Sequence, residues 1–377
     1  MATFRGNFEV IFGTDKFQLL VEWLEKNKVK KIGMVVDQNL LNNSAFLRWK
    51  EFLEVQFTIS FLKVLKLSSE PSYQFVDFEF ESICAQEVDV LLAFGGGSVL
   101  DIAKGFSILY RNAGPSSALK GFNKVATAGI PLVLFPSTAG TGTEMTWTAS
   151  FIDLHTKIKL GINGQHMFPS LSVLDPDLIV SAPSAVIISA ALDVLVHAIE
   201  AVTSKNTTPF ARTLGVSSTH KILQYLPLVY KSSTDIRSIE MLQIAAAEAG
   251  LAMLNSSGGP SSGISYPLGV HFGVPHGFAG GIILPKVIER NIELGYLGYN
   301  EFFYENSHAN ETLLDKMTEV YSLVDVPNNF RNWRFNGEED VSLIYNLTLK
   351  ERKENLLLNP VEFSNDSLMS LLTSFIQ

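Results

Sequence analysis

The chain has only one cysteine, Cys84, among its 377 residues, so no intrachain disulfide can form. A single free thiol is compatible with a reducing compartment. Basic residues are also few: 29 Lys and Arg stand against 38 Asp and Glu, which gives a net charge of −9. Because a nucleic-acid surface needs a clustered basic face, this balance predicts no nucleic-acid partner.

Long apolar runs are missing as well. Asp193 interrupts the run over residues 186–196, and Glu248 interrupts the run over residues 244–254. A membrane-spanning helix needs about 20 apolar residues in a row. The N-terminus also has no apolar core of signal-peptide length. We therefore predict a cytoplasmic protein without a membrane partner.

Short β-rich runs alternate with helical patterns in the first half of the chain. Strands are expected at residues 31–36, 57–65, 88–94 and 131–135, with helices at 15–28, 75–85 and 98–109. Later helices are expected at 184–204, 211–230, 236–255 and 278–292, followed by two or three short ones after about residue 325. This pattern predicts an α/β N-terminal Rossmann-like parallel-sheet domain plus an all-α C-terminal domain. A Pro-rich junction at 175–183 divides the chain into domains 1–180 and 181–377.

Two glycine-rich turns follow predicted strands. Gly95-Gly96-Gly97-Ser98 opens a helix, where backbone N–H groups can bind a phosphate, although a tight structural turn uses the same residues. Asp101 and Lys104, taken alone, are typical of a solvated helix face. The second turn, residues 136–144, offers hydroxyls and backbone donors, or is an ordinary polar loop. Two such turns after consecutive strands converge on one sheet edge, which favours a bound nucleotide.

Three side chains in the second half suggest a metal site. Asp193 and His197 are four residues apart, so they share one helix face and could bind a divalent cation together. An Asp–His hydrogen bond inside the core is the alternative. His276 lies between Pro275 and Gly277 just before a helix, where it is either a fixed ligand or a simple helix-start histidine.

Together these motifs resemble the iron-containing (group III) alcohol dehydrogenase family, which has a dehydroquinate synthase-like fold. The family's boxes correspond to residues 95–104, to residues 136–144 with Ser137 and Thr143 as variants, to residues 193–200 with Val194 as a variant, and to residues 275–279. The resemblance covers nearly the whole chain. It implies an NAD(P)-dependent oxidoreductase that binds its cofactor in a cleft between two domains. It also suggests a homodimer.

The resemblance assigns the cofactor-binding positions residue by residue. The dinucleotide positions are Gly96, Gly97, Ser98, Asp101, Thr138 and Thr141, and Lys159 corresponds to a lysine near the nicotinamide. Asp37 falls where the family meets the adenosine ribose. A carboxylate there would repel a 2′-phosphate, so the sequence favours NAD, with NADP possible.

The family binds Fe or Zn through one Asp and three His, and this chain departs from that pattern. Asp193, His197 and His276 match three ligands, but the remaining position, fourteen residues before His276, is Ser262, a poor ligand. Tyr266 stands where many members carry a further histidine. A tyrosine at this place resembles the subgroup that reduces phosphonoacetaldehyde and related small aldehydes. Three outcomes stay open: weak metal binding with water in the gap, recruitment of His271, or metal-free chemistry with Tyr266 as general acid.

The function expected is hydride transfer between nicotinamide and a small polar aldehyde or alcohol, with Tyr266 and His276 as catalytic residues. One alternative is a metal-independent reductase of a phosphonoacetaldehyde-like or sugar-derived aldehyde. Another is a non-catalytic dinucleotide-binding relative, which the loss of a ligand histidine would favour. A sugar-phosphate lyase of the same fold would need several basic residues near the metal motifs, and few are present there.

Overall fold

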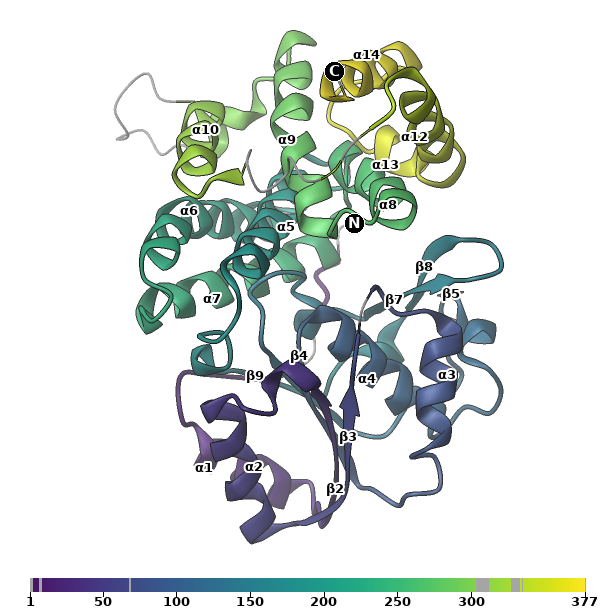
Figure 1. Cartoon of the computed structure of the whole chain (residues 1–377), viewed down its shortest axis with the longest axis vertical. Coiled ribbons are helices and arrows are strands. Elements are labelled where there is room, and N and C mark those ends of the chain that lie inside the picture. Colours follow the sequence, from purple (N-terminus) through teal and green to yellow (C-terminus); the bar gives the residue numbers. More distant parts are fainter. Residues whose placement is uncertain are drawn as a thin grey trace. The chain divides into compact units, whose positions relative to one another are not determined.

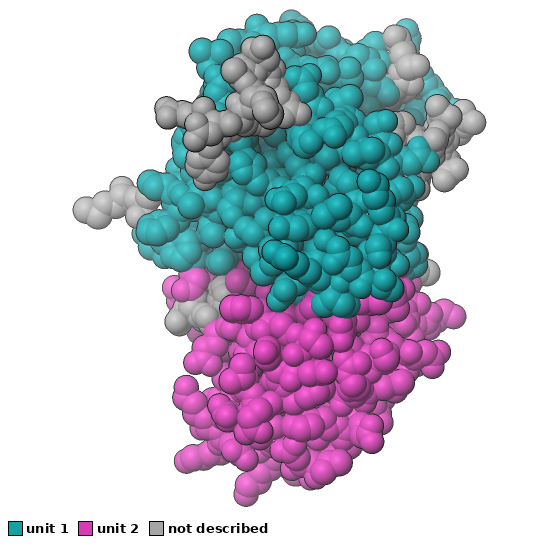
Figure 2. Space-filling model, turned by 90° about the vertical axis from the view of Figure 1, so that its left-hand side faces the viewer, with its two compact units in different colours: residues 1–5, 139–141, 183–377 teal, residues 6–138, 142–182 magenta. Residues whose placement is uncertain are grey.

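The computed structural model describes residues 3–6, 9–67, 69–302, 312–326, 333 and 335–376. The chain divides into two compact units, which Figure 2 distinguishes by colour. Residues 6–138 and 142–182 form one, here called the sheet unit. Residues 1–5, 139–141 and 183–377 form the other, here called the helical unit.

The sheet unit is built on a six-stranded sheet whose strand pairs are all parallel, as the alternating pattern predicted. The strand order is β1-β9-β6-β4-β2-β3. Its strands are β1 (Glu9–Phe12), β2 (Lys31–Asp37), β3 (Thr58–Leu65), β4 (Val90–Gly95), β6 (Leu132–Pro136) and β9 (Leu171–Leu174). Every residue of β4 and β6 is buried, because helices cover both faces of the sheet.

Successive side chains of the central strand enter different halves of the core. Leu92 and Phe94 belong to the cluster formed with α1 (Phe17–Lys26) and α2 (Ser44–Gln56). Leu91 and Ala93 belong to the cluster formed with α3 (Tyr73–Glu81) and α4 (Gly97–Leu109). This two-residue period places the two helix pairs on opposite faces of the sheet (Figure 1).

A second, three-stranded sheet lies in the same unit and was not predicted. Its strands are β5 (Gly121–Phe122), β7 (Thr148–Asp153) and β8 (Ile158–Asn163), in the order β5-β8-β7. β7 and β8 form an antiparallel pair in which the register pairs Ile152 with Lys159. The signal for β8 was present and was missed, because Ile158, Leu160 and Ile162 alternate with Lys159, Gly161 and Asn163.

The prediction of a solvated face for Asp101 and Lys104 is wrong. Lys104 is 1% exposed, and its ammonium donates to the carbonyl oxygens of Thr143, Thr146 and Thr148 at 2.6, 3.0 and 2.8 Å. The Thr143 hydroxyl oxygen also lies 2.8 Å away, so the three protons of the ammonium are fully satisfied. Burial lowers the pKa of Lys104 to about 8, against the opposing effect of Asp101 and Glu144. The lysine therefore ties α4 to the segment that leads into β7.

The helical unit contains the long helices that the sequence predicted, together with α8 and α10, which it did not. They are α5 (Ser184–Thr203), α6 (Pro209–Lys231), α7 (Ile236–Leu254), α8 (Pro260–Phe272), α9 (His276–Glu293), α10 (Leu313–Leu323), α12 (Glu338–Glu351), α13 (Lys353–Leu357) and α14 (Asn365–Ile376). One helix in the described part of the chain, α5, is long and apolar enough to cross a membrane. Its most apolar window is 72% buried within the protein, as befits the core helix of a bundle (Figure 1).

Lys104→Met should destabilise the protein by about 3 kcal/mol, because it removes a buried cation and leaves three carbonyl groups and the Asp101 carboxylate without it. Urea unfolding followed by circular dichroism measures the change. Lys66→Met replaces an exposed lysine and is the control. Equal stability of the two variants would contradict the structural role of Lys104.

Candidate active site

Three neighbouring parallel strands, β2, β4 and β6, end at one edge of the large sheet. The register pairs Val36 with Phe94 and Gly95 with Pro136. Asp37, the last residue of β2, therefore lies at the same edge as Gly96 and Ser137, which follow β4 and β6. The chain passes from β2 to β3 on one side and from β4 to β6 on the other, so the strand order reverses between β2 and β4. Open α/β sheets bind ligands at such a reversal.

The glycines at this edge have separate tasks. A Cβ on Gly95 would lie 2.6 Å from the Cβ of Val99, so this glycine is needed for the turn itself. Gly96 is the N-cap of α4 and supplies no capping side chain. The first N–H groups of a helix have no acceptor within the helix, so the start of α4, with Gly97 and Ser98, can receive an anion. A Cβ on Gly96 would approach the Thr138 side chain to 3.4 Å, which places Thr138 beside this turn.

Asp37 and Asp101, two further predicted cofactor positions, both accept hydrogen bonds from the protein itself. The Asp37 carboxylate accepts a hydrogen bond from the Asn39 amide at 2.9 Å, which fixes it at the end of β2. Asp101 accepts from the Thr143 hydroxyl and the Ser150 amide at 2.6 and 2.8 Å, and burial raises its pKa.

Lys159 forms an ion pair with Glu70 at 2.7 Å. Asp101 and Lys159 thus contribute to the framework around β7 and β8. Thr141 belongs to the helical unit, together with residues 139 and 140.

Asp193, His197 and His276 are brought together in the helical unit. One ligand atom from each lies within 4.8 Å of the other two. The Nε2 atoms of His197 and His276 lie 3.6 and 3.7 Å from Oδ1 of Asp193, too far for hydrogen bonds. The Asp–His hydrogen bond considered as an alternative is therefore not formed. Asp193 is 4% exposed, and within the described ranges its carboxylate accepts no hydrogen bond.

The hydrogen bonds of Ser265 fix the tautomer of His276. The Ser265 hydroxyl donates its single proton to the carbonyl oxygen of Ser262 at 2.7 Å. Its oxygen lies 3.2 Å from Nδ1 of His276, so it must accept a proton from that nitrogen. In neutral His276 the Nε2 lone pair then faces the Asp193 carboxylate. Two electron-rich atoms at this separation repel each other unless a cation lies between them.

This donor set fits a divalent metal. A buried carboxylate without a hydrogen-bond donor is costly, and a cation shared with two imidazoles removes that cost. The hydrogen bond from His276 to Ser265 is the type that orients metal-binding histidines. Nδ1 of His197 is buried and has no hydrogen-bond partner among the described residues, so the structure fixes the tautomer of His276 alone.

Glycines set the separation between the two helices that carry these ligands. A Cβ on Gly277 would lie 1.8 Å from the carbonyl oxygen of Ser189, and one on Gly281 would lie 2.6 Å from the Cβ of Leu192. Any larger residue would force α9 away from α5. Because Gly277 and Gly281 have no side chains, α9 packs closely on α5, and His276 at the start of α9 lies beside Asp193.

Ser262, at the position where the resemblance predicted a further ligand, binds Glu200 instead. Its hydroxyl donates to Oε2 of Glu200 at 2.5 Å. Glu200 also accepts from the amides of Gly259 and Ser261 at 2.6 Å and from the Ser262 amide at 3.3 Å, so it caps the start of α8. Burial raises the pKa of this carboxyl group, and the four donors oppose that effect. His271 is exposed near the end of α8 and is not part of the metal-ligating group.

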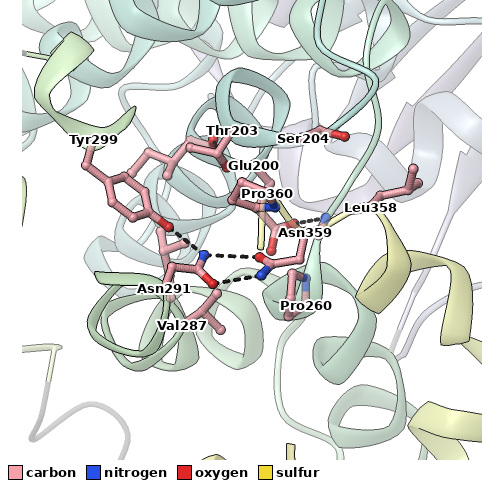
Figure 3. A pocket seen from close by; sticks show the side chains of 13 residues that line it. Glu200, Thr203, Ser204, Pro260, Val287, Asn291, Tyr299, Leu358, Asn359 and Pro360 are labelled. Carbon is pink, nitrogen blue, oxygen red and sulfur yellow. Dashed lines mark hydrogen bonds between the residues drawn. The ribbon is translucent and has the colours of Figure 1, made fainter. Parts of the chain in front are cut away.

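A small cavity of about 10 Å³ lies on the other side of Glu200 and has room for one water molecule at most. Asn291 and Asn359 pair through both amides at 2.7 and 3.0 Å, and Asn291 also donates to the Tyr299 hydroxyl at 2.8 Å (Figure 3). The cavity is too small for an aldehyde. The cavity therefore offers no substrate site.

Tyr266 lies beside the metal-ligating group, as its place in the sequence suggested. Its ring is 5.1 Å from that of His276 and meets it at 70°. Sequence reasoning missed Ser265, for which no signal existed. It also missed the task of Glu200, although a glutamate inside an apolar helix was a usable signal.

The fold and the Asp-His-His group define a two-unit protein with a nucleotide-type sheet edge and a metal-type site. The model of the iron-containing alcohol dehydrogenase family matches residues 7–176, and that of the family's C-terminal domain matches residues 187–376. The chain therefore belongs to the iron-containing alcohol dehydrogenase family.

Individual relatives agree with this assignment. The NAD-dependent methanol dehydrogenase of Bacillus methanolicus is 31% identical over 55% of this chain and 54% of its own length. The sulfoacetaldehyde reductase of Bilophila wadsworthia is 28% identical over 66% of this chain and 61% of its own length. The chain thus spans little more than half the length of these relatives. The crystal structure of a 1,3-propanediol oxidoreductase is similar over 100% of this chain and 100% of its own chain, with a TM-score of 0.90 and 22% sequence identity.

Ser265→Ala should weaken metal binding about 10- to 100-fold, because His276 loses the acceptor that fixes its tautomer. Competition with a fluorescent chelator measures the dissociation constant for Zn²⁺. Ser261→Ala is the matched control, since the Ser261 hydroxyl lies on the same helix and makes no hydrogen bond in the described structure. An equal effect of both substitutions would refute the orienting role of Ser265.

Proposed function

We propose that the chain is an NAD(P)-dependent alcohol dehydrogenase that interconverts a small polar aldehyde and its alcohol. The observation that carries the proposal is the buried Asp193 carboxylate, which accepts no hydrogen bond from the described residues and faces the lone pair of His276. Such an arrangement calls for a cation. The activities of the two relatives, a methanol dehydrogenase and a sulfoacetaldehyde reductase, support a small alcohol or aldehyde as substrate.

We assign separate tasks to the two domains expected from the sequence. Residues 1–180 would bind the dinucleotide through Asp37, Gly96, Gly97, Ser98, Thr138 and Thr141, with Asp101 and Lys159 supporting that surface. Residues 181–377 would hold Fe or Zn through Asp193, His197 and His276, and would hold the substrate. A homodimer in the cytoplasm remains part of the proposal.

The residues of the chain act on the carbonyl group. A metal held by Asp193, His197 and His276 would supply Lewis-acid polarisation of the carbonyl oxygen, and a bound reduced nicotinamide would supply the hydride. His276 keeps its Nδ1 proton on Ser265. The Tyr266 phenol donates a proton to the alkoxide oxygen and regains one from solvent. Aldehyde, NAD(P)H and a proton thereby become alcohol and NAD(P)⁺.

A second candidate is a reductase in which Tyr266 acts without metal. The engagement of Ser262 with Glu200 favours it, because only three protein ligands remain. Elemental analysis and calorimetry with NADH and NADPH on one purified sample separate the candidates. About one Fe or Zn per chain with tight dinucleotide binding supports the metal enzyme. Dinucleotide binding without metal and without turnover of any aldehyde would support the non-catalytic alternative.

Ser262→His should raise metal affinity, because an imidazole at this position supplies a fourth strong ligand. Metal content after exhaustive dialysis is the measurement. Ser262→Ala also loses the hydrogen bond to Glu200 but supplies no ligand, so it should give no gain. If the histidine variant retains no more metal than the alanine variant, Ser262 is not the missing ligand position.

Asp37→Ser should shift the preference from NADH towards NADPH by about tenfold or more, because it removes a negative charge near the ribose 2′ position. Serine also caps helical turns, so the turn that begins after residue 37 should persist. Calorimetry with both dinucleotides gives the ratio of dissociation constants. An unchanged ratio would show that Asp37 does not contact the ribose.

A further inference from the structure

A cationic side chain lies next to the candidate metal site and has no assigned role. The guanidinium carbon of Arg352 lies 3.6 Å from the centre of the Tyr266 ring. That ring is in turn 5.1 Å from the ring of His276. The guanidinium is therefore within about 9 Å of the His276 imidazole. All three residues belong to the helical unit.

The backbone around Arg352 determines where its side chain lies. Arg352 is the single residue between α12 and α13, and it ends one helix and begins the next. Gly263 of α8 packs against this junction, where an added Cβ would lie 3.0 Å from the Cβ of Asn355 and 3.5 Å from that of Arg352. The junction of two helices thus brings an arginine to α8, where it stacks on Tyr266.

Arginine suits this position chemically. Stacking on an aromatic ring uses the flat face of a guanidinium, whereas hydrogen bonding uses its edge. One side chain can therefore stack on Tyr266 and bind a carboxylate, sulfonate or phosphonate through two parallel N–H groups. A lysine would provide charge at this place but no planar fork.

We propose that Arg352 binds an anionic group on the substrate, so that the preferred substrate is a short aldehyde with a carboxylate, sulfonate or phosphonate at its other end. This inference rests on the proposed reductase function. Because the guanidinium lies no more than about 9 Å from the His276 imidazole, the two ends of the substrate must be close together, which favours aldehydes of about two to four carbons. Tyr266 would separate the anion from the carbonyl.

The test compares succinic semialdehyde with its methyl ester, which is similar in shape and uncharged, using metal-restored protein with NADH and with NADPH. Arg352→Gln should lower kcat/KM for the semialdehyde about 10- to 100-fold, mainly through KM, and should change the value for the ester less than about threefold. Arg352→Lys should lie between Arg352→Gln and the wild type. Lys350→Gln removes an exposed cation from α12, two residues before Arg352, and should change kcat/KM for neither substrate.

Equal losses on both substrates, or no loss on either, would overturn the assignment of Arg352 while leaving the reductase function intact. If the wild type reduces neither compound, the reductase function fails instead. Calorimetric titration of chelator-treated protein with methanesulfonate then tests whether Arg352 binds an anion, independently of any reductase activity. Weaker binding to Arg352→Gln than to Lys350→Gln supports the site, and equal binding refutes it.

Discussion

The helical unit depends on how two buried carboxylates of α5 are compensated. Glu200 accepts hydrogen bonds from the amides of Gly259, Ser261 and Ser262 and from the Ser262 hydroxyl. Asp193, two turns earlier on the same helix, accepts none within the described ranges and has two imidazoles at 3.6 and 3.7 Å. A buried charge must be compensated in one way or another. Glu200 is compensated by the fold and therefore acts structurally, whereas Asp193 is left for a cation.

The sheet unit shows a similar division of tasks at its carboxyl edge. Gly95 is a packing requirement of the strand-to-helix turn, while Gly96 leaves the start of α4 open. Beneath this edge, Asp101 and Lys104 hold α4 to the segment around β7 through buried polar contacts. The surface that would bind a dinucleotide is thus supported by residues within the same motif, and not every residue of that motif needs to touch a ligand.

Sequence reasoning succeeded where a single physical signal dominated. The apolar run of β4 indicated burial on both faces, and the long apolar pattern of α5 indicated a core helix with Asp193 and His197 on one side. It failed for α8, because Pro267, Gly263 and several serines obscure the helical pattern. It also failed for Lys104, since a lysine on a helix is usually exposed unless carbonyl groups from distant residues surround it. The roles of Ser265 and Ser262 depend on which neighbour each hydroxyl meets, and this information exists only in the folded chain.

Position 262 contributes to the candidate site through its backbone. Its carbonyl oxygen accepts the Ser265 proton, and this hydrogen bond makes Ser265 an acceptor for His276. Every amino acid has that carbonyl group. The side chain at this position can therefore be exchanged without removing the hydrogen bond that orients the neighbouring imidazole. The chemistry of residue 262 and the orientation of His276 are thus separable.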